Sequence, residues 1–502
     1  MIDKYYFFYD ESEHSRSITK ETITADNFSN DFIAAIIGYK DENSKSVESK
    51  YQRIESKYKT YYSVDELKSS IIKKAKYVNG FRTFKDKDIE FIYVFLSFLF
   101  DNKLELYITV QNKIEYVVNQ LLSSYKNSLL VDADVLRYSV TKIINLYKPE
   151  KVIESIYAND GSFITKLRDF LNLLLKQNQK NNSKKSENEA IKQMLIILDD
   201  YEDNFIINWD YRTSFEGFKL FAQEKNIKNY TLIIDKEGNG KTLNAAIQES
   251  ISNASEQDSK NTIGIRITDI IAGIVSRFII SINNALAYKN MQDGSNLKFL
   301  DDKWFLIDEK RFECYKLLKK VIVDLNSTWY KTYCTNYSDN FLYFICLINY
   351  FDSYDSFDKY QKISIDDHKY KVNGGALIAL KERHILLQNK LPIDSINKDF
   401  ENSDFYYNQR GAKCFYDYRK HEVLSISKTG SRYEILSVGF FGKMEKGCTT
   451  INDNGTPVCY LLPDDLMEWA ITCVSFANKG ERLFPSFVTF TYHNGRNYAD
   501  IE

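Results

Sequence analysis

The sequence predicts an α/β fold in which a mixed sheet flanked by helices is interrupted by a helical insertion and followed by a β-rich C-terminal module. Short apolar runs, rich in aromatic and β-branched residues, predict buried strands at residues 5–9, 31–38, 103–110 and 229–234. Apolar patches at helical spacing predict the insertion at about 114–225. We expect a sheet domain over residues 1–290, a helical connector over 291–351 and the β-rich module over 352–502.

The composition is that of a globular protein. The chain has 502 residues, of which 44% are hydrophobic, so it can bury more than one core. No apolar run approaches the roughly 20 residues of a membrane span, and the first residues lack a signal-peptide pattern, so we expect a cytoplasmic protein without a membrane partner. The net charge of -2 neither requires nor excludes a nucleic-acid partner.

The first candidate site residue follows the first strand. Five aromatic residues lead directly into Asp10-Glu11-Ser12-Glu13. Carboxylates at the end of a rigid strand are well placed to hold a metal ion. Taken alone, the simpler interpretation is that Asp10 and Glu11 solvate a strand end. Three later segments strengthen the metal-site hypothesis because they carry acids in comparable places.

Those three acids are Glu66, Asp235 and Asp269. Glu66 stands three residues after Ser63, a spacing that is also typical of a helix start. Asp235 ends the strand at 229–234. Asp269 is expected in the first turn of an apolar helix that begins near Ile270, where an acid also interacts favourably with the helix dipole.

A second motif near Asp235 resembles part of a phosphate-binding loop but lacks the glycine spacing of that loop. Gly240-Lys241-Thr242 follows a strand, as in a phosphate-binding loop. That loop requires a glycine five positions before Gly240, where the chain has Asp235. We therefore expect Gly238 and Gly240 to release the chain from the strand into a helix.

The four acids together predict a site for Mg²⁺ or Mn²⁺. These ions prefer carboxylate oxygens and retain several waters. A pair of such ions can activate a water and neutralise the leaving oxygen during phosphodiester cleavage. The sequence therefore favours a metal-dependent nuclease acting on DNA or RNA.

The order of these motifs resembles the bacterial family known as domain of unknown function 3800. The resemblance rests on Asp10-Glu11-Ser12, on Glu66-Leu67-Lys68, on the strand that ends at Asp235, and on Ile267-Thr268-Asp269 with Ala272-Gly273. It covers about residues 1–290 and implies a divergent ribonuclease H-like fold. It also implies that Asp10, Glu66, Asp235 and Asp269 bind metal, that Lys68 contacts a phosphate, and that the protein acts in anti-phage defence.

Two departures from the family pattern leave a second hypothesis open. Glu13 replaces a usual glycine, and Thr268, a smaller departure, replaces a usual alanine. The near-neutral net charge and the long β-rich tail also favour the second hypothesis. A non-catalytic binding or assembly protein, serving as a subunit of a defence complex and using the C-terminal module for a protein partner, fits the same sequence. A third hypothesis, a stacking surface for single-stranded nucleic acid, rests on the 37 Tyr and 33 Phe residues, although core packing explains most of these rings.

Overall fold

The chain forms two compact units. The computed structural model describes residues 3–12, 17–21, 30–124, 133–178, 184–199, 201, 204–210, 212–238, 240–287, 299–325, 337, 339–388, 421–427, 429–441, 446–478, 483–493 and 495–502. Unit 1 comprises residues 1–120 and 139–380, and unit 2 comprises 121–138 and 381–502. Glu13, whose place in the site the sequence left open, lies outside the described residues.

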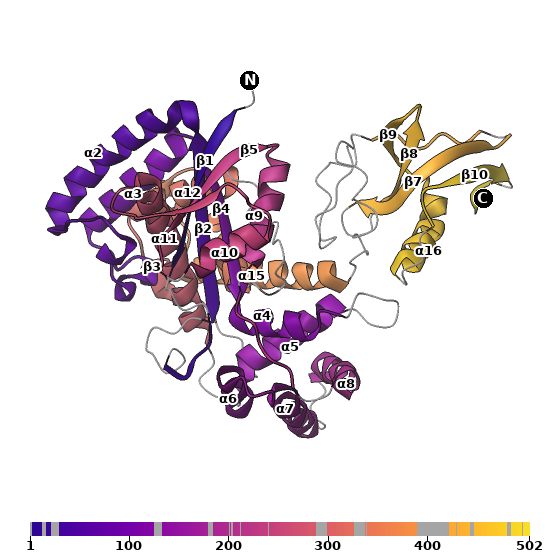
Figure 1. Ribbon diagram of the computed structural model, residues 1–502, viewed down its shortest axis with the longest axis horizontal. Coiled ribbons are helices and arrows are strands. Elements are labelled where there is room, and N and C mark those ends of the chain that lie inside the picture. The colour runs from indigo at the N-terminus through magenta and orange to yellow at the C-terminus, as the bar shows by residue number, and fades with distance from the viewer. Residues whose placement is uncertain are drawn as a thin grey trace. The chain divides into compact units, whose positions relative to one another are not determined.

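Unit 1 is built around a mixed five-stranded sheet in the order β4-β2-β1-β5-β6 (Figure 1). Its strands are β1 (Lys4–Ser12), β2 (Asp31–Lys40), β4 (Glu105–Asn112), β5 (Asn229–Asp235) and β6 (Ala254–Gln257). Strand β2 runs antiparallel to both β1 and β4, whereas β1, β5 and β6 are parallel to one another. The predicted α/β fold with a mixed sheet is therefore confirmed.

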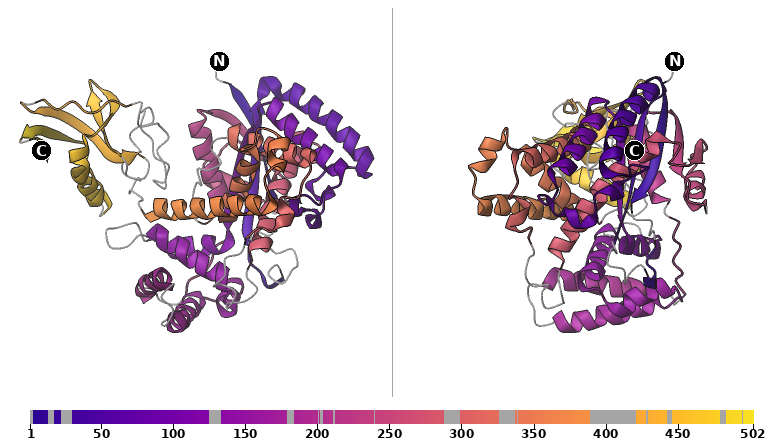
Figure 2. Two further views of the ribbon diagram at one scale, coloured as in Figure 1. Left: turned by 180° about the vertical axis from the view of Figure 1, so that it is seen from behind. Right: turned by 90° about the vertical axis from the view of Figure 1, so that its left-hand side faces the viewer.

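Helices cover both faces of this sheet because its strands are apolar on both sides. Phe8, Ile33 and Ala35 face one core, and Phe7 and Phe32, one residue away along the strands, face the other. The first core also contains residues of α2 (Ser44–Tyr62), α3 (Asp86–Asp101), α11 (Ile263–Leu286), α12 (Glu309–Lys319) and α13 (Asp339–Asp352). The second core contains residues of α9 (Thr213–Glu224) and α10 (Lys241–Gln248), and Figure 2 shows this layering from two further sides.

The predicted helical insertion lies between β4 and β5. Its helices are α4 (Lys113–Leu121), α5 (Ala133–Tyr147), α6 (Glu150–Ala158), α7 (Phe163–Asn178), α8 (Lys185–Asp199) and α9. Helices α6 and α8 both pack on α7. The first unit also contains a short strand, β3 (Val78–Phe81), and the short helical turns Asp41–Asn43, Ser69–Ile71, Lys74–Tyr77 and Asp302–Trp304. A π-helical turn at Lys320–Asp324 extends α12.

The secondary structure after residue 352 differs in part from the prediction. Helices α14 (Phe357–Gln361) and α15 (Ile365–Gln388) occupy a stretch for which short strands were predicted. The β-rich character predicted for this module is found farther along the chain, in strands that include β7 (Ser431–Phe441) and β10 (Ser486–His493).

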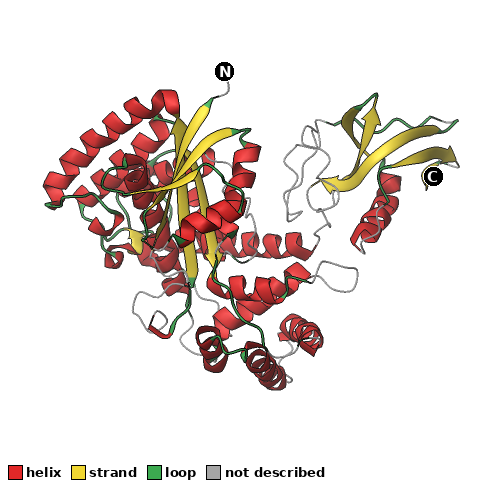
Figure 3. Ribbon diagram, in the orientation of Figure 1, coloured by secondary structure: helices red, strands yellow, loops and turns green. Residues whose placement is uncertain are grey.

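Unit 2 contains a second, antiparallel sheet in the order β11-β10-β7-β8-β9. Its remaining elements are β8 (Lys446–Asp453), β9 (Thr456–Leu461), α16 (Met467–Asn478) and β11 (Arg496–Ile501). Helix α16 covers β7 and β8. Figure 3 shows the two sheets in yellow. None of the helices in the described parts of the chain is long and apolar enough to cross a membrane.

Candidate functional site

Two of the predicted acids lie on neighbouring strands of the sheet, Asp10 inside β1, which continues to Ser12, and Asp235 at the end of β5. Strands β1 and β5 are parallel, and their register pairs Tyr9 with Ile234. Asp10 and Asp235 are the next residues of the two strands. Asp10 is buried and Asp235 is half-buried. The parallel pairing thus brings together two acids that are more than two hundred residues apart in sequence.

Helix α11 carries the third acid, Asp269, against strand β1. A Cβ atom at Gly264 would lie 2.3 Å from the Phe8 ring, so glycine is what allows the helix to approach the strand. The Thr268 hydroxyl lies 3.1 Å from the carbonyl oxygen of Phe8 and tethers the helix two residues before Asp10. The predicted helix start near Ile270 was wrong: α11 begins at Ile263, so Asp269 lies inside the helix rather than in its first turn.

Ser69 holds the carboxylate of Asp269 through two hydrogen bonds. Its backbone N–H donates to Oδ2 at 2.7 Å, and its hydroxyl donates to Oδ1 at 2.8 Å. Arg277, two helical turns after Asp269, donates from Nη1 to the Ser69 carbonyl at 2.7 Å. Gly273 leaves the space for this contact, because a Cβ atom there would lie 2.2 Å from Cβ of Ser69.

A matching arrangement holds Asp235. The backbone N–H groups of Lys236 and Ser259 donate to its Oδ1 at 3.0 and 3.2 Å. Arg266 of α11 donates from Nη1 to the carbonyl of Ser259 at 2.6 Å. Arg266 is itself fixed by a buried bidentate ion pair with Glu55 of α2, at 2.8 and 3.0 Å. Helix α11 therefore supports two of the acids through one arginine and one serine each.

Glu66 lies in an irregular segment after α2. The helix start predicted at Ser63 was wrong, because Ser63 has a left-handed backbone and ends α2, with its N–H donating to the carbonyl of Lys59. Glu66 Oε2 lies 3.5 Å from Nζ of Lys68. Glu66 Oε1 is buried and has no hydrogen-bond partner in the described part of the chain.

We call Asp10, Glu66, Asp235 and Asp269 the acid cluster. The charges of Asp235 and Asp269 both act on Asp10, and Glu66 stands three residues before Ser69, which binds Asp269. Burial, and then repulsion from Asp269 and Asp235, raises the pKa of Asp10 well above its ordinary value. Burial also raises the pKa of Asp235 and of Asp269, while the positive charge of Lys68 acts in the opposite direction on both.

The charges of two acids of this cluster act on Tyr51 of α2. Burial, and then the charge of Glu55, raises the pKa of Tyr51, with smaller contributions from Asp269 and Glu66. Its hydroxyl is buried without a hydrogen-bond partner among the described residues. The charges of Asp269 and Glu66 thus both act on this buried tyrosine.

The donor chemistry of the cluster fits a divalent cation. Asp10 is buried and makes no ion pair with a described lysine or arginine, and Glu66 leaves a buried carboxylate oxygen unsatisfied. A hard cation would relieve both conditions. Across the described residues, however, no set of three or more histidine, cysteine, aspartate or glutamate side chains is already arranged to hold a metal ion.

Sequence reasoning missed the residues that position the acids. Ser69, Arg266 and Arg277 were not singled out, because each acts across a long separation in sequence. One signal was available: two arginines inside an otherwise apolar helix need buried partners. Their spacing of three residues before and eight residues after Asp269 places them on either side of that acid along α11.

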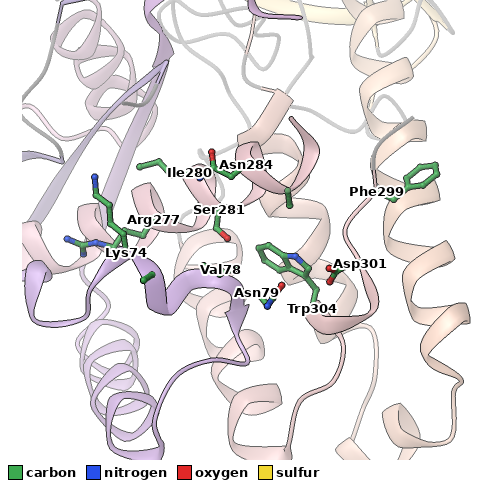
Figure 4. Close-up of a pocket in the computed structure, with 12 residues that line it drawn as sticks. Lys74, Val78, Asn79, Arg277, Ile280, Ser281, Asn284, Phe299, Asp301 and Trp304 are labelled. Carbon is green, nitrogen blue, oxygen red and sulfur yellow. The ribbon is translucent and has the colours of Figure 1, made fainter. Parts of the chain in front are cut away.

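A cavity of about 380 Å³ lies along the later turns of α11, from Arg277 to Ala285 (Figure 4). Its polar lining includes Lys74, Asn79, Ser281 and Asn284, and Trp304 closes its apolar side. Arg277 also lines it, so this arginine links the cavity to Ser69 and Asp269. None of the four acids lines this cavity.

Comparison of the chain with protein-family models, with curated proteins and with solved structures finds no match. The resemblance to domain of unknown function 3800 therefore stays a prediction.

Proposed function

We propose that the chain is a divalent-metal-dependent nuclease that hydrolyses phosphodiester bonds of DNA or RNA. The observation that carries this proposal is the placement of three acids: Asp10 and Asp235 follow the paired residues Tyr9 and Ile234 of neighbouring parallel strands, and Asp269 lies on the helix bound to β1 through Thr268. Burial raises the pKa of Asp10, and the charges of Asp269 and Asp235 accordingly raise it further. The strand order and the acids at the ends of the parallel strands support a ribonuclease H-like arrangement. A role in anti-phage defence, with a protein partner on the C-terminal module, belongs to the same proposal.

Each residue has a proposed role. Asp10, Glu66, Asp235 and Asp269 would hold Mg²⁺ or Mn²⁺, which when bound supplies an activated water and neutralises charge on the phosphate. Lys68, whose side chain is about half exposed beside the acid cluster, would contact a phosphate oxygen. Ser69 and Ser259 position the carboxylates of Asp269 and Asp235, and Arg277 and Arg266 hold these two serines in place.

The test is cleavage of labelled single-stranded and duplex DNA and RNA by the full chain in Mg²⁺ or Mn²⁺. Asp10→Asn and Asp269→Asn remove a charge at nearly constant shape, so we expect folded proteins without activity. Asp101→Asn, at an exposed position on α3, is the matched control and should keep full activity. Activity that persists in both site variants would overturn the assignment.

One observation favours a second function, that of a non-catalytic binding protein. The described acids are not already arranged as a set of metal ligands. Calorimetric titration with Mn²⁺ separates the two proposals. A nuclease site should bind Mn²⁺ in a manner that Asp10→Asn and Asp235→Asn weaken, whereas a binding protein that has lost the chemistry should show no such dependence.

A further inference from the structure

A strongly basic segment begins at the acid cluster. Residues 67–85, which we call the basic tract, contain six cations and no aspartate or glutamate: Lys68, Lys73, Lys74, Lys76, Arg82 and Lys85. In the whole chain, by contrast, 67 lysines and arginines are balanced by 69 acids. The tract is therefore a local concentration of positive charge that the overall composition conceals.

The structure directs this charge outward. Leu67, Ile72, Tyr77, Phe81 and Phe84 are buried in the first core of unit 1 and anchor the tract at regular intervals. The cations between these anchors are exposed or half-exposed. Hydrogen bonds secure the tract to its neighbours, among them one from the Ser281 hydroxyl to the Tyr77 carbonyl at 2.6 Å and one from Arg311 Nε to the Phe81 carbonyl at 3.2 Å. A fixed backbone thus presents a row of cations to solvent.

Four of these cations have no acid of their own. Lys73, Lys76, Arg82 and Lys85 make no ion pair with any residue in the described ranges. Acids on adjoining elements are engaged elsewhere. Asp86 and Asp308 both pair with Arg311. Asp301, which lines the cavity beside Lys74, accepts the N–H of Lys303 at 3.0 Å.

The tract is continuous with the proposed active site. Ser69 belongs to it and holds Asp269, and Lys68 acts electrostatically on Asp235 and Asp269. Farther along, Lys74 and Asn79 line the cavity of Figure 4, which adds polar groups beside the row of cations. A polyanion lying on the tract would therefore lead directly to the acids.

We infer that the basic tract binds the phosphate backbone of a nucleic acid and leads it to the acid cluster. The inference rests on the proposed function for the nature of the ligand. Phosphates along a strand are regularly spaced negative charges, and binding them releases condensed counterions, so affinity falls steeply with salt. Exposed cations without acidic partners on a fixed backbone meet this requirement, and no bound metal ion is needed for it.

The experiment is fluorescence anisotropy with labelled 20-nucleotide single-stranded DNA, single-stranded RNA and the two duplexes, in EDTA and over a range of KCl concentrations. The test variant of the full chain is Lys73→Gln, Lys76→Gln and Arg82→Gln combined, which leaves Lys68 and Ser69 intact. Its matched control replaces Lys228, Lys320 and Lys362, three exposed lysines outside the tract, with Gln. Thermal unfolding establishes that both variants are folded.

We expect the tract variant to bind about tenfold or more weakly at low salt and to lose about 2 to 3 from the slope of log K against log[KCl], one contact for each cation removed. The control should match the wild type. Equal affinity and slope in the two triple variants would overturn the inference, as would a wild-type chain that binds none of the four probes. Equally tight binding of poly-glutamate would overturn it too, because it would indicate a general surface for acidic protein.

The outcomes also separate this inference from the proposed function. If the tract variant binds like the control while Asp10→Asn abolishes cleavage, the nuclease assignment stands and the tract inference fails. If binding depends on the tract but no probe is cleaved in Mg²⁺ or Mn²⁺, the tract inference stands and the nuclease assignment fails.

Discussion

Ser69 binds both carboxylate oxygens of Asp269, although the two residues are 200 positions apart in the chain. The backbone N–H of Ser69 is bonded to one oxygen and its hydroxyl to the other, at 2.7 and 2.8 Å. Each oxygen retains a lone pair that could face a cation. The orientation of this acid is therefore set by the segment after α2 and not by α11 alone.

Replacing Ser69 with Ala tests this relationship. The hydroxyl bond is lost while the backbone bond remains, so we expect a stability loss of about 1 kcal/mol and a fall in Mn²⁺ affinity of about 10- to 100-fold. Urea unfolding and calorimetry measure the two effects. Ser70→Ala, at an exposed neighbour, is the control, and an equal effect in both variants would exclude a specific role for Ser69.

The Gly273→Ala variant tests the space behind Ser69. The new Cβ atom would lie 2.2 Å from Cβ of Ser69 and 2.7 Å from Nη1 of Arg277, so both groups must move. We expect a loss of about 1–3 kcal/mol in the free energy of unfolding. Gly374→Ala in α15, where no atom lies within 4 Å of the added Cβ, should instead stabilise by about 0.5–1 kcal/mol. Denaturant melts that show the same sign for both would contradict this reading of Gly273.

The ion pair between Glu55 and Arg266 supports Asp235 from a distance. Glu55→Ala leaves the arginine buried without its partner, and we expect a loss of about 3–5 kcal/mol in stability. Cleavage should also fall, because Arg266 holds the carbonyl of Ser259, whose N–H is bonded to Asp235. Glu90→Ala, which breaks an exposed pair with Lys57, should have a much smaller effect on stability and none on cleavage.

The raised pKa of Asp10 predicts an unusual pH dependence. In the folded chain this carboxyl binds its proton more tightly than in the unfolded chain, where the pKa is near 3.8. Its contribution to stability is thus largest at low pH and is lost as the pH rises through the folded-state pKa. In EDTA, the Tm of the wild type should fall as the pH rises above the range in which an ordinary aspartate titrates, and Asp10→Asn should reduce this fall.

Bound metal should oppose this fall of the Tm with rising pH, because a cation competes with the proton for the same carboxylate. Mn²⁺ should raise the Tm of the wild type more at pH 8 than at pH 5, with little effect on Asp10→Asn. Asp101→Asn is again the control. A wild-type Tm profile in EDTA that Asp10→Asn leaves unchanged would show that this acid does not carry the effect.

Local patterns in the sequence predicted the sheet but not how its site is supported. The strands that end near Asp10 and Asp235 were predictable because they are short, apolar and aromatic, and their apolar character persists on both faces of the sheet. The start of α11 was not, because residues 263–267 have the apolar, β-branched composition of a strand. The helix is fixed there instead by the contact of Gly264 with Phe8 and by the Arg266–Glu55 pair.

Helix α15 is a second element that the sequence did not predict. The Gly374-Gly375 pair argues against a helix. Tertiary packing overrides that propensity, since His368, Val372 and Ala376 are buried at a spacing of four residues. That spacing can be read from the sequence, but the sequence does not show that a hydrophobic core lies against this face of the helix.

The most direct test of the account is anomalous diffraction from crystals of the full chain soaked in Mn²⁺. The account predicts an anomalous peak bounded by carboxylate oxygens of Asp10, Glu66, Asp235 and Asp269, and its loss in crystals of Asp10→Asn. A peak elsewhere, or none in crystals that diffract well and contain millimolar Mn²⁺, would contradict it.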